Sequence, residues 1–449
     1  MSKAISTPIA AIVLAAGKGT RMQSQLPKVL HPIANRPMLQ HTLELAKAVG
    51  CAPIVTVAGP EMPAVEKLGA EYGLTAIQRE QLGTANAVLA AKDTLAKTKA
   101  HLLVLYGDTP LITPETIAQL TEQLDEPNVA VAVLGFVTEA PGAYGRLLVA
   151  EDATLEAIVE AKDADEEELE IPFCNSGVMA LHKDHAWDLL DAIGNNNAAG
   201  EYYLTDAVAV ARSKGLTCIP IAGEEEEVLG VNSRVELAQA DAILQYRLRY
   251  NAMVGGATLL DPDSVYFSAD THIGKDVTIQ PHVFFGPNVT LEDGVTIKAF
   301  SHLEGCVVKA NATVGPMARL RPGAEIGADA RIGNFVEIKK ATIETGAKIS
   351  HLSYIGDAVI GANANIGAGT ITCNYDGFNK YKTEIGSDAF IGSNTALVAP
   401  VKVGSGAMVG AGSVITEDVA DDALTFTRTD QTHKEEWAKA FRAKQDKKA

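Results

Sequence analysis

The chain has few cysteines, fewer basic than acidic residues and no long apolar run, and each shortage excludes a class of protein. Its 449 residues include five cysteines, an odd number without any CxxC pair. This pattern excludes a disulfide framework and a zinc ribbon, and it predicts free thiols in a cytosolic protein. The five are Cys51, Cys174, Cys218, Cys306 and Cys373.

Basic residues are outnumbered, with 38 Lys and Arg against 56 Asp and Glu, so the net charge is −18. So acidic a field attracts neither nucleic acid nor an anionic membrane, and we expect no partner of either kind. A negative net charge is nevertheless compatible with small anionic ligands that are bound by local Lys and Arg residues. No stretch is long and apolar enough to cross a bilayer, and the apolar run at residues 9–16 is short for a signal peptide. We therefore predict a cytoplasmic protein.

The second half of the chain carries a hydrophobic repeat of six residues. From Ile385 to Ile415 an aliphatic residue occupies every sixth position, and similar apolar runs cover 273–303 and 314–338. A helix repeats every three or four positions and a strand every two, whereas six accommodates one short strand and one turn. Three such turns close one triangular coil. The repeat therefore predicts a β-helix, because the irregular strands of a sandwich or barrel would not keep one period.

The repeat slips at three places. The last slip contains the polar segment 373–377 and ends near Lys380. Segments ejected from a rigid scaffold commonly carry function, so we predict a functional loop there. The irregular steps are eleven residues from Leu303 to Val314, five from Ile338 to Ile343 and nineteen from Ile366 to Ile385.

The first half alternates strands and helices, with strands expected at 9–15, 52–58, 101–106 and 129–136 and a helix near 38–49. This order predicts an α/β unit with a parallel sheet, whose ligands bind beyond the carboxyl ends of the strands. The loop 14–22 follows the first strand and is rich in glycine. It matches neither the dinucleotide nor the P-loop fingerprint. Backbone N–H groups near Gly17 and Gly19 could still meet a triphosphate.

The motif LAAGKGTRM at 14–22, followed by LPKVL at 26–30, resembles the signature of sugar-1-phosphate nucleotidyltransferases. The motifs QLGT, YGD, YGR, NSG and GVN follow in that family's order, beginning at residues 81, 106, 144, 175 and 230. Together with the repeats, HLSY at 351–354 and ITCNYDG at 371–377 resemble members that also transfer an acetyl group. The resemblance implies a Rossmann-like nucleotidyltransferase domain followed by a left-handed parallel β-helix of hexapeptide repeats. The expected parts are domain 1–233, linker helix 234–254, β-helix domain 255–430 and flexible tail 431–449.

Two successive reactions are implied by this resemblance. The β-helix domain would acetylate glucosamine 1-phosphate from acetyl-CoA, and the first domain would join the product to UTP, releasing pyrophosphate. The final product would be UDP-N-acetylglucosamine for peptidoglycan and lipopolysaccharide. The expected enzyme is a cytoplasmic homotrimer assembled through the β-helix. It uses Mg²⁺ and small-molecule substrates, and its acetyl-transfer site lies where subunits meet.

For uridyl transfer the resemblance implies an oxygen-ligated metal held by Asp108 and Asn232, a choice that suits Mg²⁺. Lys28 and Arg21 would neutralise phosphate charge, and Thr205 resembles a further sugar contact. The residues implied to bind UTP or its sugar-linked product are Leu14, Ala15, Ala16, Gly17, Arg21, Lys28, Gln78, Gly83, Thr84, Tyr106, Gly107, Asp108, Gly145, Glu160, Asn175 and Asn232.

For acetyl transfer the candidate general base is His351, because an imidazole titrates near neutrality. The glucosamine 1-phosphate contacts implied by the resemblance are Arg321, Lys339, Tyr354, Asn365, Asn374 and Lys380. The implied acetyl-CoA contacts are Ala368, Asn374, Tyr375, Ser393, Ala411 and Arg428.

Three alternatives stay open from the residues alone. The chain could be a monofunctional sugar-1-phosphate nucleotidyltransferase whose β-helix serves only assembly or regulation. It could be a scaffold that trimerises through the solenoid while its sites have decayed. The third alternative is a zinc carbonic anhydrase with three histidine ligands. It is suggested by His272, His282 and His302, although their spacing differs from the spacing in that class.

Overall fold

The computed structural model describes residues 7–197 and 199–445. These residues form two compact units that divide between Arg247 and Leu248, within helix α9 (Arg234–Val254). On α9, Leu237 and Leu244 pack against the core of the first unit, whereas Leu248 packs against the core of the second. The helix expected at 234–254 is therefore part of both units. No helix among the described residues is long and apolar enough to span a membrane.

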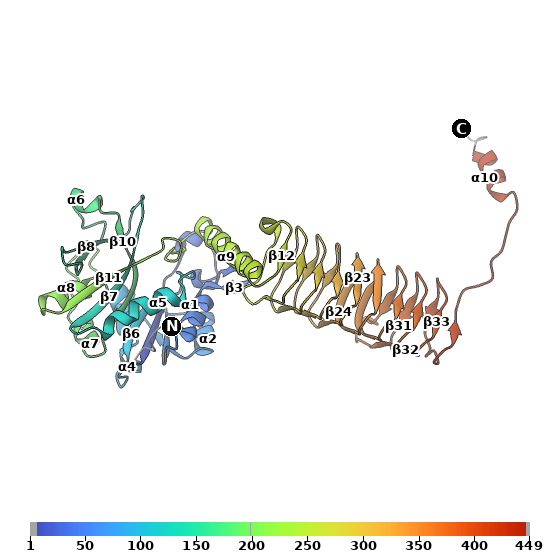
Figure 1. The fold of residues 1–449 in the computed structure, drawn as a ribbon, viewed down its shortest axis with the longest axis horizontal. Coiled ribbons are helices and arrows are strands. Elements are labelled where there is room, and N and C mark those ends of the chain that lie inside the picture. Colours follow the sequence, from blue (N-terminus) through green and yellow to red (C-terminus); the bar gives the residue numbers. More distant parts are fainter. Residues whose placement is uncertain (1–6, 198, 446–449) are drawn as a thin grey trace. The chain divides into compact units, whose positions relative to one another are not determined.

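The first unit is built on one twisted sheet with the strand order β11-β7-β10-β6-β1-β4-β5 (Figure 1). Strand β1 is buried along its whole length, as its continuous apolar sequence predicts. The strands are β1 (Ile9–Ala15), β4 (Ile54–Ala58), β5 (Leu74–Ile77), β6 (His101–Tyr106), β7 (Val129–Val137), β8 (Arg146–Val149), β9 (Leu155–Val159), β10 (Phe173–Leu181) and β11 (Thr217–Gly223).

The sheet is mixed, so the expectation of a parallel sheet was wrong in one part. Strands β1, β4, β5 and β6 pair in parallel, and so do β7 and β11. Strand β10 runs antiparallel to both β6 and β7, and β8 and β9 form an antiparallel pair beside it. A buried strand has the same apolar sequence in either direction, so this pattern could not reveal the reversal.

Helices cover both faces of this sheet. Successive side chains of β1 point to opposite sides, so Ile12 joins one core layer and Val13 the other. One layer includes residues of α3 (Thr84–Leu89), α7 (Ala186–Leu190) and α8 (Asp206–Ser213), and the other includes residues of α1 (Met38–Ala48), α2 (Pro63–Ala70) and α5 (Pro114–Glu122). Because Leu14 pairs with Tyr106, the loops after β1 and β6 leave the same edge of the sheet.

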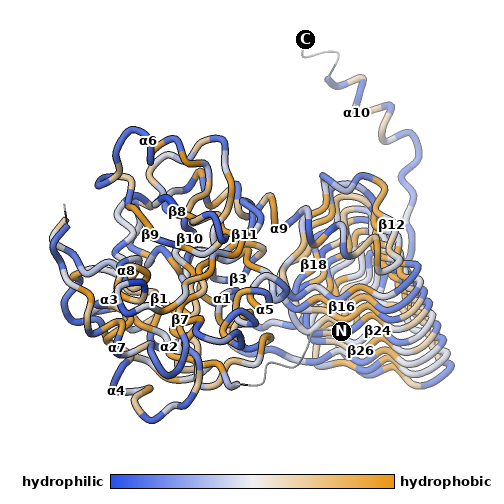
Figure 2. Tube along the Cα trace, turned by 60° about the vertical axis from the view of Figure 1, so that its left-hand side comes forward, coloured by the Kyte–Doolittle hydropathy of each residue, from blue (hydrophilic) through white to orange (hydrophobic). Residues whose placement is uncertain are grey.

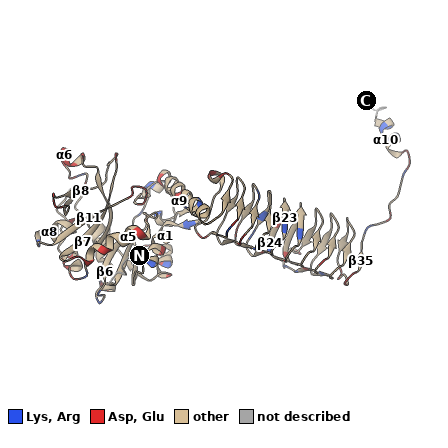
Figure 3. Cartoon of the chain, in the orientation of Figure 1, with Lys and Arg blue, Asp and Glu red and all other residues tan. Residues whose placement is uncertain are grey.

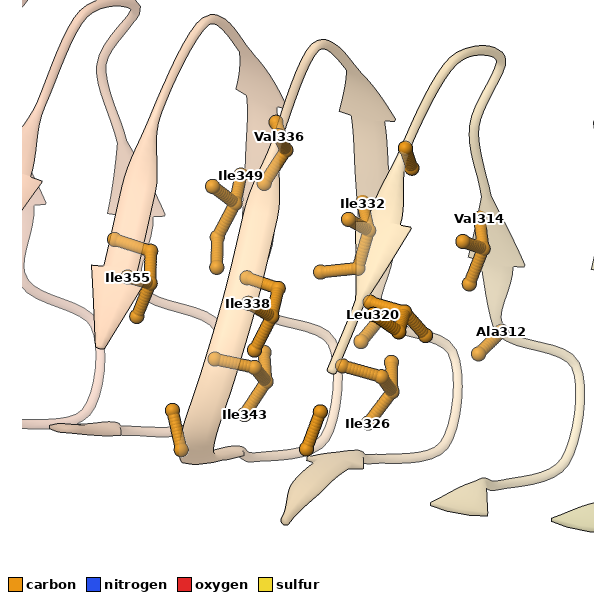
Figure 4. Close-up of a cluster of buried hydrophobic side chains, with 14 of the residues drawn as sticks. Ala312, Val314, Leu320, Ile326, Ile332, Val336, Ile338, Ile343, Ile349 and Ile355 are labelled. Carbon is orange, nitrogen blue, oxygen red and sulfur yellow. The ribbon is translucent and has the colours of Figure 1, made fainter. Parts of the chain in front are cut away.

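The second unit is a parallel β-helix whose coils each contribute strands to three faces. The buried position of nearly every six-residue repeat is confirmed. Figure 4 shows Val314, Leu320 and Ile326 pointing into the coil interior beside the equivalent residues of the next coil. Each such side chain contributes roughly 1.5–3 kcal/mol on transfer from water. Figure 2 shows the same alternation as hydrophobic bands that recur from coil to coil.

The three faces are distinct ladders of parallel strands. One face contains β12 (Thr258–Leu259), β14 (Thr278–Ile279), β17 (Thr296–Ile297), β20 (Thr313–Val314), β23 (Arg331–Asn334), β25 (Lys348–His351), β27 (Asn365–Ile366), β30 (Phe390–Ile391), β33 (Met408–Val409) and β35 (Leu424–Thr425). A second contains β15 (Phe284–Phe285), β18 (His302–Leu303), β21 (Arg319–Leu320), β28 (Ile371–Cys373), β31 (Ala396–Val398) and β34 (Val414–Ile415). The third contains β13 (His272–Ile273), β16 (Val289–Leu291), β19 (Cys306–Val308), β22 (Ala324–Ile326), β29 (Thr383–Ile385) and β32 (Val401–Val403).

Strands β24 (Glu337–Ile343) and β26 (Tyr354–Ile360) pass through the corner between the second and third faces. Lys340 and Asp357 take positive φ in the middle of these strands. This corner explains the five-residue step from Ile338 to Ile343. The eleven-residue step hides a buried residue, Val308, and so consists of one step of five and one of six. The nineteen-residue step contains an ejected hairpin, described below.

After β35 the chain continues into an exposed helix, α10 (Trp437–Gln445). Trp437 and Phe441 stack on each other along it, with ring centroids 5.2 Å apart. This helix lies in the segment expected to be a flexible tail, and residues 446–449 lie outside the described part of the chain.

Candidate active sites

The loop after β1 forms one wall of a cavity of about 560 Å³ at the carboxyl edge of the sheet. Gly19 takes φ +61°, and a Cβ at this position would lie 2.5 Å from Cβ of Lys28. Only glycine therefore allows the loop to pass so close to the lysine. The Gln81 amide donates a 2.6 Å hydrogen bond to the Ala16 carbonyl and joins this loop to the segment before α3.

Lys28 and Asp108 line this cavity, and Asn232 contacts Lys28. The Lys28 ammonium contacts the Asp108 carboxylate and donates a 2.9 Å hydrogen bond to Oδ1 of Asn232. The backbone amide of Val231 donates to the Asp108 carbonyl, which fixes the two loops together. Both candidate metal ligands thus offer an oxygen to a single cation. This donor set fits Mg²⁺, which prefers oxygen ligands and keeps several open positions.

A second group of polar residues lies beside Tyr106. A Cβ on Gly177 would be 2.9 Å from the Tyr106 ring, which shows how closely β10 approaches it. The Asn175 backbone amide donates to the Gly145 carbonyl at 2.8 Å. Burial raises the pKa of Glu160, and a 3.2 Å hydrogen bond donated by Thr205 partly opposes that rise. Burial, followed by the charge of Asp108, raises the pKa of the Tyr106 phenol.

The structure brings most of the candidate nucleotide residues to this cavity. Arg21 is exposed on the short η1 turn (Thr20–Met22), and Gly107 is buried behind Asp108. Sequence analysis missed Glu201, which also lines the cavity and has no motif that could have revealed it. The candidate residues that line it are Leu14, Ala15, Ala16, Gly17, Lys28, Gln78, Gly83, Thr84, Tyr106 and Asp108.

In the β-helix, His351 belongs to a column of residues on successive coils. The backbone amides of Gly369, Asn394 and Gly412 donate in turn to the carbonyls of His351, Ala368 and Ser393. Arg428 ends the column by donating a 2.6 Å hydrogen bond to the Ala411 carbonyl. Neighbouring coils are about 4.8 Å apart, so the column extends about 15–20 Å from the imidazole to the guanidinium. Residues distant in sequence thus form one straight edge with an imidazole at one end and a guanidinium at the other.

The His351 ring has one polar partner that sequence analysis missed. Its Nδ1 lies 2.6 Å from Oδ1 of Asn334, which is its register partner one coil earlier. Both side chains line a hollow of about 460 Å³ together with Lys298 and Arg331. Figure 3 shows the basic residues around β23 that belong to this face. The five-residue step from Ile338 to Ile343 was the available signal, because it shortens this coil from 18 to 17 residues and so makes Asn334 the neighbour of His351.

The candidate sugar-phosphate residues lie mainly on the second face, close to the ejected hairpin. Tyr354 and Asn374 converge over Gly356, where a Cβ would be 2.4 Å from the Tyr354 hydroxyl and 2.9 Å from the Asn374 amide nitrogen. Lys339 is the register neighbour of Gly356. Arg321 donates a 2.7 Å hydrogen bond to Glu337. Asn365 lies instead on the first face, beside Lys348.

The ejected hairpin, residues 374–381, is closed by a bridge between Tyr375 and Lys380. The Lys380 ammonium lies 3.9 Å from the centre of the Tyr375 ring. Asp376 accepts hydrogen bonds from the backbone amides of Phe378 and Asn379, and these bonds hold its pKa below the usual value. Lys380 also lines a hollow of about 480 Å³ that shares no residue with the hollow beside His351. A single chain therefore places His351 and Lys380 in separate hollows.

The three histidines that suggested a zinc site, His272, His282 and His302, do not form a metal-binding cluster. Within residues 7–197 and 199–445, no group of three or more His, Cys, Asp or Glu side chains is arranged to hold a metal ion. His282 stacks on Phe300 and His302 stacks on Phe284, each with ring centroids within 5.0 Å.

Fold and sites together define a nucleotidyltransferase unit joined to a hexapeptide-repeat acyltransferase unit. Residues 11–171 match the MobA-like NTP transferase domain, 302–375 the GMPPB C-terminal domain and 382–417 six bacterial transferase hexapeptide repeats. The chain is 57% identical to the bifunctional protein GlmU of Paramagnetospirillum magneticum over 98% of both chains. It is 55% identical to the Azorhizobium caulinodans protein of that name, over 97% of this chain and 98% of the other. It is 51% identical to the Zymomonas mobilis one, over 98% and 99%.

The chain therefore belongs to the GlmU family of bifunctional transferases. The β-helix is the left-handed parallel β-helix of hexapeptide repeats that the sequence predicted. Family membership implies sugar-phosphate and nucleotide substrates, and it excludes the monofunctional and scaffold alternatives as the class of this protein.

Proposed function

We propose that the β-helix unit transfers the acetyl group of acetyl-CoA to glucosamine 1-phosphate and that the first unit then uridylates the product. The observation that carries this proposal is the column from His351 to Arg428. Its length suits an extended acyl-CoA, with the thioester at the imidazole and a phosphate at the guanidinium. The separate cavity of the first unit has the size that a nucleotide requires, and Lys18 and Lys28 line it.

In acetyl transfer, the glucosamine nitrogen attacks the thioester carbonyl, the C–N bond forms and the C–S bond breaks. Nε2 of His351 accepts the proton that the amine loses and returns it to the departing sulfur. Tyr354 and Asn374 orient the sugar, while Arg321, Lys339 and Lys380 hold its phosphate. Ala368, Ser393 and Ala411 contribute backbone groups along the acyl-CoA, and Tyr375 packs against it.

In uridyl transfer, a phosphate oxygen of N-acetylglucosamine 1-phosphate attacks the α-phosphorus of UTP, and pyrophosphate departs. Lys28 and Arg21 neutralise charge that develops on the phosphates, while the amides of the loop 14–17 donate to them. Gln78, Gly83 and Thr84 bind uracil, and Gly145, Glu160 and Asn175 bind the sugar. Asp108 and Asn232 would hold Mg²⁺, which supplies charge stabilisation to the transferring group when bound.

Assembly into a homotrimer is the third part of the proposal. Phe300, Met317, Phe335 and Leu352 occupy one corner of successive coils, all with positive φ and all 44–60% exposed. Exposed apolar ladders of this kind commonly mark interfaces. The ladder runs beside His351, and Phe378 at the hairpin tip is 91% exposed. A second copy on this ladder would join the hollow of Lys380 to that of His351.

The deciding experiment compares the intact protein with His351→Ala in two assays. Thiol release from acetyl-CoA should require glucosamine 1-phosphate and fall by about 10²–10⁴-fold in the variant. Pyrophosphate release from UTP and N-acetylglucosamine 1-phosphate should be unchanged. If the intact protein released no thiol from acetyl-CoA in the first assay, acetyl transfer would be refuted.

The trimer is tested separately with Phe335→Glu. Light scattering should show a trimer for the intact chain and a smaller species for this variant, with acetyl transfer lost and uridyl transfer kept. A monomeric, fully active intact chain would contradict the trimeric site.

A further inference from the structure

We propose that Asn334 is a positioning residue that holds His351 in the tautomer required of a general base. The proposal rests on the acetyl transfer proposed above. Asn334 is the last residue of β23, and His351 is the last residue of β25 on the next coil. The parallel ladder fixes the two backbones side by side, and the Asn334 carbonyl accepts the Leu352 amide at 3.0 Å. The 2.6 Å contact between the side chains is therefore built on rigid strands.

The chemistry of the contact selects one tautomer. An amide oxygen can only accept a hydrogen bond, so Nδ1 of His351 must carry the proton. Nε2 is then unprotonated and has the lone pair that a base needs. The opposite tautomer would place two acceptors 2.6 Å apart. Loss of the Asn334 oxygen would free the ring to rotate and to populate that inactive form.

The charges around the pair explain why a neutral amide suits this position. Lys298 and Arg331 line the same hollow, Lys348 is the register partner of Arg331, and no carboxylate lines the hollow. An amide orients the ring without adding charge beside it. An aspartate would also accept from Nδ1, but its negative charge would favour the imidazolium.

The test compares Asn334→Ala, Asn334→Asp and, as a control on the same hollow, Thr313→Ala. For Asn334→Ala we expect kcat of acetyl transfer to fall by about 10–100-fold with little change in the KM for acetyl-CoA. Asn334→Asp should recover much of kcat and shift the acidic limb of the pH profile upward. Thr313→Ala should have the same kcat and the same pH profile of acetyl transfer as the unaltered protein. Uridyl transfer by the same samples reports intact folding.

The tautomer itself can be read from ¹⁵N shifts of histidine-labelled protein, with the His351 signals assigned by their absence in His351→Ala. The unaltered protein should show a protonated Nδ1 and an unprotonated Nε2, and Asn334→Ala should show a mixture. An unchanged tautomer and unchanged kcat in Asn334→Ala would overturn the positioning role. An active His351→Ala would instead overturn the proposed base, so the two failures are distinguishable.

Discussion

At the residue scale, Lys28 occupies the place between Asp108 and Asn232 where a divalent cation would bind. The ammonium must therefore leave these oxygens before a metal can reach both of them. We predict that Lys28→Met binds Mn²⁺ more tightly than the unaltered protein in the absence of nucleotide, as measured by electron paramagnetic resonance. The same variant should lose about 10²–10³-fold in uridyl transfer, because a donor to the phosphates is missing.

Lys18→Met is the matched control, since Lys18 lines the cavity but forms no ion pair within 4 Å in the described part of the chain. Its Mn²⁺ affinity without nucleotide should stay unchanged. Equal affinities in Lys28→Met and the unaltered protein would show that the ammonium does not compete with the metal.

His41 makes stability of the first unit depend on pH. Burial is the main cause that lowers its pKa to about 4, and its Nε2 lies 3.2 Å from the Ile33 carbonyl, to which the neutral ring can donate. The unfolded chain binds the proton from about pH 6.5 downward, the folded chain only near pH 4. The stabilising contribution is thus complete above pH 6.5 and is lost as the pH falls towards 4.

We therefore expect His41→Gln, which keeps a donor for Ile33, to flatten the fall in unfolding free energy between pH 6.5 and 4. The slope removed should be at most about 1.4 kcal/mol per pH unit. Urea denaturation across that range measures it. An identical pH slope in the variant would show that His41 does not cause the dependence.

Sequence reasoning located the polar candidates better than the groups that position them. Lys28, Asp108 and Asn232 came from a family resemblance, and the structure brings the three side chains together. Glu201 was missed because a single acidic residue in a loop has no pattern. Asn334 could have been found from the five-residue step between Ile338 and Ile343, which shortens that coil to 17 residues and makes Asn334 the neighbour of His351.

At the element scale, the six-residue repeat predicted the β-helix because side-chain burial repeats with the coil geometry. The slips were harder to interpret. The step of five from Ile338 to Ile343 marks a strand, β24, that continues through a corner, and not an ejected loop. Strand direction in the first unit could not be predicted, because apolar residues bury equally well in β10 running either way.

The hairpin 374–381 is held by its own hydrogen bonds, and this predicts a binding defect when they are removed. Asp376→Ala would leave the amides of Phe378 and Asn379 without their side-chain acceptor and free the Tyr381 hydroxyl. We expect a raised KM for glucosamine 1-phosphate by about tenfold, because a loosened hairpin must be ordered on binding. Melting temperature should hardly change, since the hairpin is exposed.

Steady-state kinetics and calorimetry of Asp376→Ala, compared with Glu417→Ala, test this prediction. Glu417 is an exposed acidic residue outside the hairpin, so Glu417→Ala should keep both the KM for glucosamine 1-phosphate and the melting temperature of the unaltered protein. A KM in Asp376→Ala equal to that of the control would mean that the hairpin is held by other contacts.

At the scale of the whole molecule, the two cores predict two separable unfolding transitions. The first unit and the β-helix have their own buried clusters, and the chain divides within α9. Ile338 is fully buried in the β-helix, and Val133 is fully buried in the sheet of the first unit. Ile338→Ala should therefore cost about 2–5 kcal/mol in the β-helix alone, since a cavity acts on the core that contains it.

Differential scanning calorimetry with both activities followed after heating provides the measurement. Ile338→Ala should lower the transition at which acetyl transfer is lost, whereas Val133→Ala should lower the one at which uridyl transfer is lost. Each variant serves as the control of the other, because both remove buried methyl groups. If either variant moved both transitions equally, the two units would unfold as one cooperative body, and α9 would couple their stabilities.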